Sequence, residues 1–154
     1  MMRILVATDG SPHPLRAAEV AARLARELRE AELLLINVGH IPAVALAGPG
    51  PDAMINLSMI EEALESAGKA ILDQTQRVFA GIAAPVARVY RRGGDPSTEI
   101  LKAGEEAHAD LIVMGSRGLG QIGGLILGSV REHVLHGAHT PVLVVRRSAD
   151  EQGI

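Results

Sequence analysis

The sequence predicts an α/β fold: an open five-stranded parallel sheet with helices on both faces. Five short, mostly apolar runs alternate strictly with four segments whose apolar residues recur at helical spacing, which is typical of a parallel sheet with crossover helices. Apolar residues make up 47% of the chain but aromatic residues only 1%, so the core must consist of small aliphatic side chains that pack closely. A chain that starts in the middle and extends outward in both directions gives the strand order 3-2-1-4-5.

The expected strands cover residues 3–8, 33–38, 85–90, 111–114 and 141–146. The first two are continuous apolar runs, as expected for strands that are buried on both faces. The third is more polar and alternates in character, which indicates a position near an edge of the sheet.

Four segments show helical spacing: residues 15–29, residues 56–79, a segment beginning at Pro96, and residues 129–136. Asp95 suits the N-cap of the third helix, and Gly137 suits the end of the fourth. The connection over residues 39–55 is long for a compact domain and rich in Gly, Pro and Ala, so we expect a flap or a functional loop there. In the second helix, the expected buried face consists of Leu57, Ile60, Leu64, Ala67, Ile71 and Val78.

The composition excludes several classes of function. A formal net charge of −3 provides no electrostatic attraction to nucleic acid or to an anionic membrane, and the absence of cysteine excludes disulfides and thiolate chemistry. No apolar run reaches transmembrane length, and the first run stops at Asp9 without the features of a signal peptide. We therefore expect a cytoplasmic protein with one domain at residues 1–147 and a polar tail at residues 148–154.

Residues 110–130 form the stretch that is most committed to a ligand. The fourth strand ends at Gly115, a glycine-rich loop follows, and Gly128 and Ser129 stand at the start of the last helix. A strand, a glycine loop and a helix N-terminus together present backbone N–H groups to a phosphate. In the predicted sheet this loop leaves the point where the strand order reverses, which brings Asp9 and Val38 next to it.

Two familiar phosphate-binding motifs do not fit this loop. The Walker pattern is absent, because no lysine follows any of the glycines. A G-x-G-x-x-G string spans residues 118–123, but it follows the fourth strand, and the residue about twenty positions further on is Leu143 instead of an acid. Dinucleotide binding is therefore not expected.

The spacing of the loop residues is specific. Two residues separate Gly115 from Gly118, and nine separate Gly118 from the pair Gly128-Ser129. This G-2x-G-9x-G-[S/T] pattern resembles the universal stress protein family, in its ATP-binding branch. The resemblance extends over nearly the whole chain, with further matches at residues 4–11, 113–118, 127–130 and 140–145. It implies an adenine nucleotide alpha hydrolase-like, Rossmann-like fold, and ATP as the ligand, with or without Mg²⁺.

The resemblance also implies a role for ten residues. Asp9 would lie at the ribose–phosphate side, Val38 would hydrogen-bond adenine through its backbone, and Ala7 and Met114 would line the pocket. Ala7 stands where some ATP-binding members have proline, and we expect little effect from that difference. The phosphates and ribose would be wrapped by Gly115, Arg117, Gly118, Gly128, Ser129 and Val130.

These roles agree with the chemistry of the residues, although simpler roles stay open. Gly115 and Gly118 have no side chain to block phosphate oxygens, and Ser129 offers a hydroxyl and an N–H at a helix start, where the helix dipole favours anions. Arg117 can add charge-assisted hydrogen bonds. The alternatives are an N-cap role for Asp9 and for Ser129, a solvated Arg117, and a core position for Val38.

We therefore expect an ATP-binding regulatory protein of the stress response, whose nucleotide-bound state an unknown protein partner would sense. Asp9 is the only clear acid in the predicted site, and no lysine or second acid is evident there, so no catalytic residue is assigned. One alternative is a slow ATPase or phosphotransferase, and another is a dimeric interaction module without a nucleotide role. No metal site is expected, because no carboxylate spacing completes one around His133, His136 and His139.

Residues 141–146 form a hydrophobic strand that would lie at an edge of the sheet, a position that proteins normally protect. Pairing with the same strand of a second copy would cover it. The family resemblance also implies a homodimer through this strand.

Overall fold

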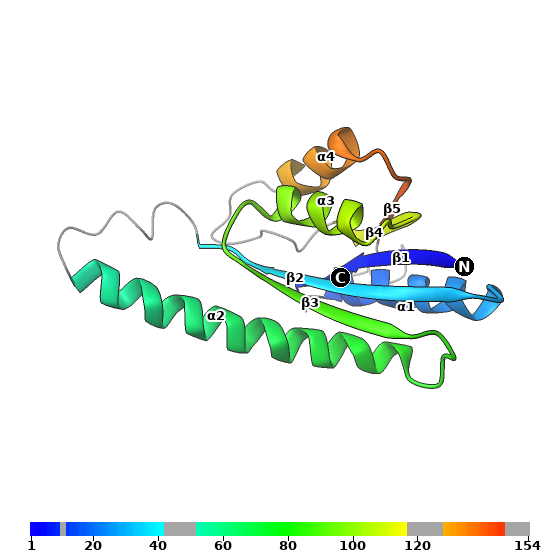
Figure 1. The fold of residues 1–154 in the computed structure, drawn as a ribbon, viewed down its shortest axis with the longest axis horizontal. Helices are drawn as coiled ribbons and strands as arrows, with labels where there is room; N and C mark the ends of the chain where they lie inside the picture. The colour runs from blue at the N-terminus through cyan, green and yellow to red at the C-terminus, as the bar shows by residue number, and fades with distance from the viewer. Residues whose placement is uncertain (10–11, 42–51, 117–127, 147–154) are drawn as a thin grey trace, which may run out of the picture.

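The computed structural model describes residues 1–9, 12–41, 52–116 and 128–146. Its sheet has the order β3-β2-β1-β4-β5, and every neighbouring pair of strands is parallel (Figure 1). The predicted fold class and strand order are thus confirmed, including the edge position of the third strand. The strands are β1 (Met2–Ala7), β2 (Ala31–Gly39), β3 (Val86–Arg92), β4 (Leu111–Gly115) and β5 (Val142–Val145).

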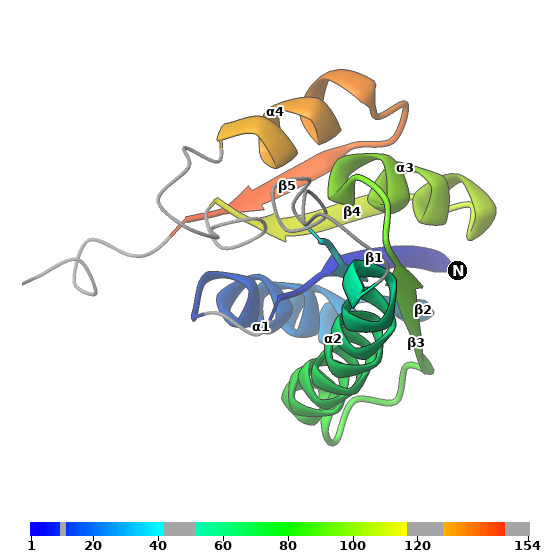
Figure 2. The same ribbon diagram turned by 90° about the vertical axis from the view of Figure 1, so that its left-hand side faces the viewer.

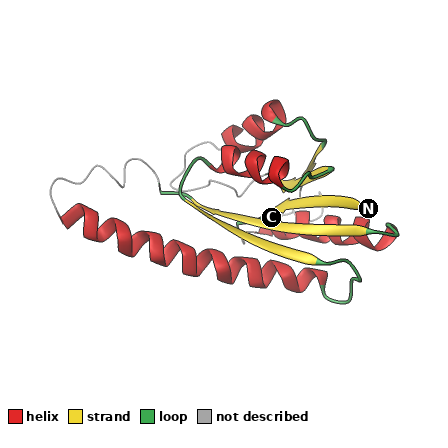
Figure 3. Cartoon of the chain, in the orientation of Figure 1, coloured by secondary structure: helices red, strands yellow, loops and turns green. Residues whose placement is uncertain are grey.

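The helices of the described residues cover both faces of the sheet. Figure 2 shows α1 and α2 on one side and α3 and α4 on the other, and Figure 3 distinguishes the same elements by secondary structure. On the first side, α1 packs on β1, β4 and β5, while α2 packs on β2 and β3. On the second side, α3 packs on β1, β2 and α4. The helices are α1 (Pro12–Glu27), α2 (Asp52–Gln76), α3 (Pro96–Glu106) and α4 (Gly128–Gly137).

The core consists of two hydrophobic clusters that the sheet separates. Successive residues of a strand point to opposite faces, so β1 contributes Ile4 and Val6 to the α1–α2 side and Leu5 and Ala7 to the α3–α4 side. Five alanines of α1 are buried against the first cluster, which lets this helix approach the sheet closely: Ala17, Ala18, Ala21, Ala22 and Ala25. The scarcity of aromatic residues is therefore matched by a tightly layered core.

Identifiable hydrogen bonds determine where α3 begins and where it ends. Asp95 is the N-cap, as predicted, and its carboxylate accepts a hydrogen bond of 3.0 Å from the Thr98 N–H. At the other end, His108 adopts a left-handed backbone with φ of 50°, and the Ala109 N–H donates to the Gly104 carbonyl at 2.8 Å. Together with the 3.0 Å bond from the His108 N–H to the Glu105 carbonyl, this geometry is a Schellman motif.

Several boundaries differ from the prediction. Helix α1 begins at Pro12 instead of residue 15, because a proline in the first turn of a helix removes no intrahelical hydrogen bond. Helix α2 begins at Asp52, so the last four residues of the expected 39–55 loop are helical, and the helix gives way to a 3-10 turn at Arg77–Phe79. Residues 42–51 of that loop lie outside the described residues.

The predicted buried face of α2 is only partly right, because four of its members are half-buried: Leu57, Leu64, Ile71 and Val78. Ile60 is 38% exposed and Ala67 is exposed, whereas Gly68, Leu72 and Thr75 are buried. The buried stripe lies about one residue further along the helix than expected. The prediction counted only apolar residues, but here a glycine and a hydrogen-bonded threonine occupy the face toward the sheet.

Candidate functional site

The candidate site lies at the topological switch point, where the strand order of the sheet reverses. Strand β1 stands between β2 and β4, so the chain connections from β1 and from β4 leave in opposite directions at their carboxyl ends. Ala7 pairs with Ile36, and the Thr8 N–H continues the ladder with a 2.9 Å bond to the Ile36 carbonyl. The same register, extended by two residues beyond the Ala7–Ile36 pair, sets Asp9 beside Val38. By this register, Asp9, which follows β1, and Val38 of β2 are expected to be neighbours.

Four of the predicted site residues meet in one cluster on the α3–α4 side of the sheet. Ala7, Met114 and Val130 are buried members of this cluster, at 0%, 1% and 5% exposure, and the half-buried Val38 packs against the cluster. Gly115 is the last residue of β4 and is buried as well. The structure thus brings together residues from β1, β2, β4 and α4 that are far apart in the sequence.

The remaining predicted residues are partly described. Gly128 and Ser129 are the first two residues of α4, so their backbone N–H groups belong to the helix turn that has no intrahelical acceptors. Their side-chain surroundings, and all of Arg117 and Gly118, lie outside the described residues. The expected boundary at Ser129 is one residue late, because the helix begins at Gly128.

Arg131 is a further residue at this end of the molecule that the sequence prediction did not identify. Its Nη1 lies 3.4 Å from the Ser116 carbonyl and its Nη2 lies 3.2 Å from the Glu132 carboxylate. The Ser116 N–H in turn donates to the Val145 carbonyl at 2.9 Å. A basic residue near a helix N-terminus opposes the helix dipole, and this could have marked Arg131 as a residue with a local role.

Three buried polar side chains beneath the site were also missed. Thr8, Asn37 and Thr75 are 0%, 6% and 0% exposed, and hydrogen bonds join them across β1, β2 and α2. The signal was available, because Thr8 and Asn37 interrupt two apolar strands near their carboxyl ends. Polar side chains at buried positions of this kind are normally satisfied within the fold.

The outer rim of this end, between β3 and α2, carries a charged network. Arg92 pairs with Glu65, and Lys69 lies 3.0 Å from the same carboxylate. Hydrogen bonds from Arg92, which has the larger effect, and from Lys69 hold the pKa of Glu65 below its usual value. Burial, with a smaller contribution from Glu65, raises the pKa of Tyr90 next to this network.

At the start of α3, burial acts to raise the pKa of Asp95, but hydrogen bonds from Ser97 and Thr98 outweigh it, so the pKa is lowered. This carboxylate is therefore ionised at neutral pH and serves as the helix cap.

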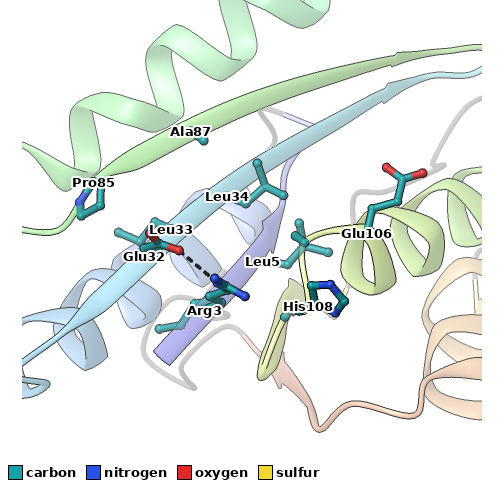
Figure 4. Close-up of a pocket in the computed structure, with 12 residues that line it drawn as sticks. Arg3, Leu5, Glu32, Leu33, Leu34, Pro85, Ala87, Glu106 and His108 are labelled. Atoms are coloured by element: carbon teal, nitrogen blue, oxygen red, sulfur yellow. Dashed lines mark hydrogen bonds and ion pairs between the residues drawn. The ribbon is translucent and has the colours of Figure 1, made fainter. Parts of the chain in front are cut away.

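A cavity of about 400 Å³ lies at the opposite end of the sheet, at the amino ends of the strands (Figure 4). Leu5, Leu34 and His108 are among its lining residues. Its charged side chains are paired, since the Arg3 Nε lies 3.1 Å from Glu32, and Glu106 accepts a hydrogen bond from Arg91. The cavity does not overlap the candidate site at the carboxyl ends.

In the parts of the chain that the structure describes, no group of three or more His, Asp or Glu side chains could hold a metal ion. Over the same residues, none of the helices combines the length and hydrophobicity needed to cross a membrane.

Fold and site together define an open α/β protein whose candidate site lies at the topological switch point. The family model described as the universal stress protein family matches residues 1–146. Universal stress protein MJ0531 of Methanocaldococcus jannaschii is 34% identical over 150 residues, which cover 97% of this chain and 84% of that protein. The chain therefore belongs to the universal stress protein family.

Solved structures agree with this assignment. Universal stress protein UspA from Lactobacillus plantarum superimposes with a TM-score of 0.77 at 25% identity, over 94% of this chain and 97% of that one. A universal stress protein crystallised in complex with cAMP has a TM-score of 0.67 at 27% identity, over 96% of this chain and 98% of the other. The five-stranded sheet described above is thus the fold of this family.

Proposed function

We propose that this protein is an ATP-binding regulator of the stress response, from the ATP-binding branch of the family. The observation that carries the proposal is the position of the G-2x-G-9x-G-S motif. Its first glycine, Gly115, ends β4, and its last pair, Gly128-Ser129, opens α4, at the carboxyl end of a parallel sheet. Such a strand end and helix N-terminus suit a phosphate group.

The roles proposed for the individual residues follow from this arrangement. Gly115 and Gly118 give the phosphates close access to the backbone, and the first turn of α4 supplies N–H donors from Ser129 and Val130. Arg117 adds positive charge, and Asp9 binds the ribose–phosphate side. The backbone of Val38 binds adenine, beside the pocket wall of Ala7 and Met114. A relative solved with cAMP supports an adenine nucleotide as the ligand. The choice of ATP rests on the resemblance of the motif to the ATP-binding branch of the family.

We further propose that the protein is cytoplasmic, with its domain at residues 1–147 and a polar tail at residues 148–154. It would work as a homodimer through the edge strand over residues 141–146, and its nucleotide state would be sensed by a protein partner. The half-exposed side chains of Val142, Leu143 and Val144 on β5 support a role for this edge.

Isothermal titration calorimetry with ATP, AMP and cAMP tests the nucleotide assignment. The wild type is expected to bind ATP, while the variant Gly118→Val, which inserts a side chain into the phosphate loop, should lose most of the binding heat. Circular dichroism checks that the variant is folded. Absence of binding at millimolar ATP, AMP and cAMP would show that the proposal is wrong.

A further inference from the structure

We infer that Thr8, Asn37 and Thr75 form a positioning network that fixes the two strand ends carrying the proposed nucleotide contacts, Asp9 and Val38. The inference rests on the proposed function, because it deepens the assignment of that site. Thr8 immediately precedes Asp9, and Asn37 immediately precedes Val38. Any constraint on the positions of Thr8 and Asn37 is therefore passed directly to Asp9 and Val38.

The directions of the hydrogen bonds in this network can be assigned. The Thr75 hydroxyl donates to the Ile71 carbonyl at 2.8 Å, because a carbonyl can only accept. Since a hydroxyl has one hydrogen, the 3.0 Å contact between the two threonine hydroxyls must have Thr8 as the donor. The chain of donation thus runs from the end of β1, through Thr75, to the backbone of α2.

Asn37 ties β2 to β1 in the same region. Its Nδ2 donates to the Thr8 carbonyl at 2.8 Å, which fixes the orientation of the amide. Its Oδ1 then faces α2 at Gly68, where an added Cβ would come within 2.6 Å of that oxygen. Gly68 and Thr75 are two helical turns apart, so one face of α2 meets both halves of the network.

Stability alone does not account for these polar groups. The ladder between β1 and β2 already joins the strands, and exchanging a satisfied buried pair for apolar groups of the same shape can be nearly neutral. What the hydrogen bonds add is geometry: they fix the spacing between the Asp9 and Val38 backbones and link it to α2. A ligand that must contact Asp9 and the Val38 backbone at once benefits from such pre-organisation.

The test compares ATP affinities of four proteins by calorimetry. Thr75→Val keeps the shape and removes the acceptor that the Thr8 hydroxyl reaches, and we expect it to weaken ATP binding roughly threefold to tenfold, as for the loss of one buried hydrogen bond. Thr75→Ser restores the hydroxyl and is expected to restore the affinity. Phe79→Leu serves as the control, because this buried residue lies in the 3-10 turn that follows α2, takes no part in the hydrogen bonds of the network, and should lower the melting temperature without altering affinity.

The outcomes separate the inference from the proposal on which it rests. If the wild type binds no nucleotide, both are overturned. If the wild type binds ATP but Thr75→Val binds equally well, or if Thr75→Ser fails to restore the affinity, only the positioning role is overturned. Should Thr75→Val not fold, Thr8→Val breaks the same contact from the other side, and the affinity comparison is made on that variant.

Discussion

At the residue scale, His108 shows how one backbone conformation can be held by its neighbours. It is the only described residue other than glycine with a positive φ, and it occupies the C′ position at which helices favour glycine. The left-handed conformation costs a side-chain-bearing residue about 1 kcal/mol. The two hydrogen bonds of the Schellman motif hold it there nonetheless.

Replacement of His108 by glycine should therefore stabilise the protein. His108→Gly removes the steric cost and is expected to increase the free energy of unfolding by roughly 0.5–1 kcal/mol, measured by urea denaturation. His108→Ala is the matched control, since it truncates the same side chain without making a positive φ easier. Equal stability of the two variants would show that the conformation is not strained.

At the element scale, α2 packs closely on β3 because two glycines, Gly39 and Gly68, leave room for the ring of Tyr90. The ring of Tyr90 on β3 lies against Gly39 of β2 and Gly68 of α2. A Cβ at Gly68 would come within 2.4 Å of the ring and 2.6 Å of the Asn37 Oδ1, so neither neighbour leaves room for a methyl group. Gly104 in α3 differs, because its nearest neighbour would be Ile112 at 3.4 Å, an ordinary contact distance.

Replacement by alanine should change the stability of the protein differently at Gly68 and at Gly104. Gly68→Ala is expected to destabilise the protein by about 1–3 kcal/mol, because the helix must shift away from Tyr90. Gly104→Ala is expected to be neutral or to stabilise by up to about 1 kcal/mol, through the higher helix propensity of alanine. Thermal unfolding followed by circular dichroism measures both, and a stabilised Gly68→Ala would refute the packing described for α2.

The edge strand β5 allows a second test at this scale. The carbonyls of Pro141 and Val145 accept hydrogen bonds from β4, so by alternation Val142 and Val144 turn their backbone groups outward. If two copies pair through this edge, Val144→Pro should produce a monomer in analytical ultracentrifugation, because it removes an outward N–H without touching the β4 ladder. Val144→Thr keeps the N–H and should remain dimeric. A monomeric wild type at tens of micromolar would contradict the proposed dimer.

At the scale of the whole molecule, the alternation of strands and helices was enough to predict the sheet and its order. Strong periodicity and sharp turn signals, such as Asp95-Pro96, define those elements locally. The buried face of α2 could not be predicted in this way, because Gly68 and Thr75 are buried for reasons that lie in other elements. Gly68 makes room for Tyr90 and Asn37, and Thr75 accepts a bond from Thr8.

The candidate site, likewise, could be predicted from the sequence only in part. The glycine spacing, the switch-point argument and the family resemblance together identified residues of β1, β2, β4 and α4 that the structure gathers at one end of the sheet. Thr8, Asn37 and Arg131 were missed because their partners are tertiary. No motif records that the Thr8 carbonyl would meet Asn37, or that Arg131 would reach the Ser116 carbonyl.

The most direct test of the central claim is an NMR titration of the isotope-labelled protein with ATP. Binding at the carboxyl ends of the strands should shift the backbone amide signals of Asp9, Val38, Gly115 and Ser129, and leave those around the amino-end cavity, such as Leu34 and His108, unchanged. Shifts confined to the cavity residues, or none at millimolar ATP, would contradict the account.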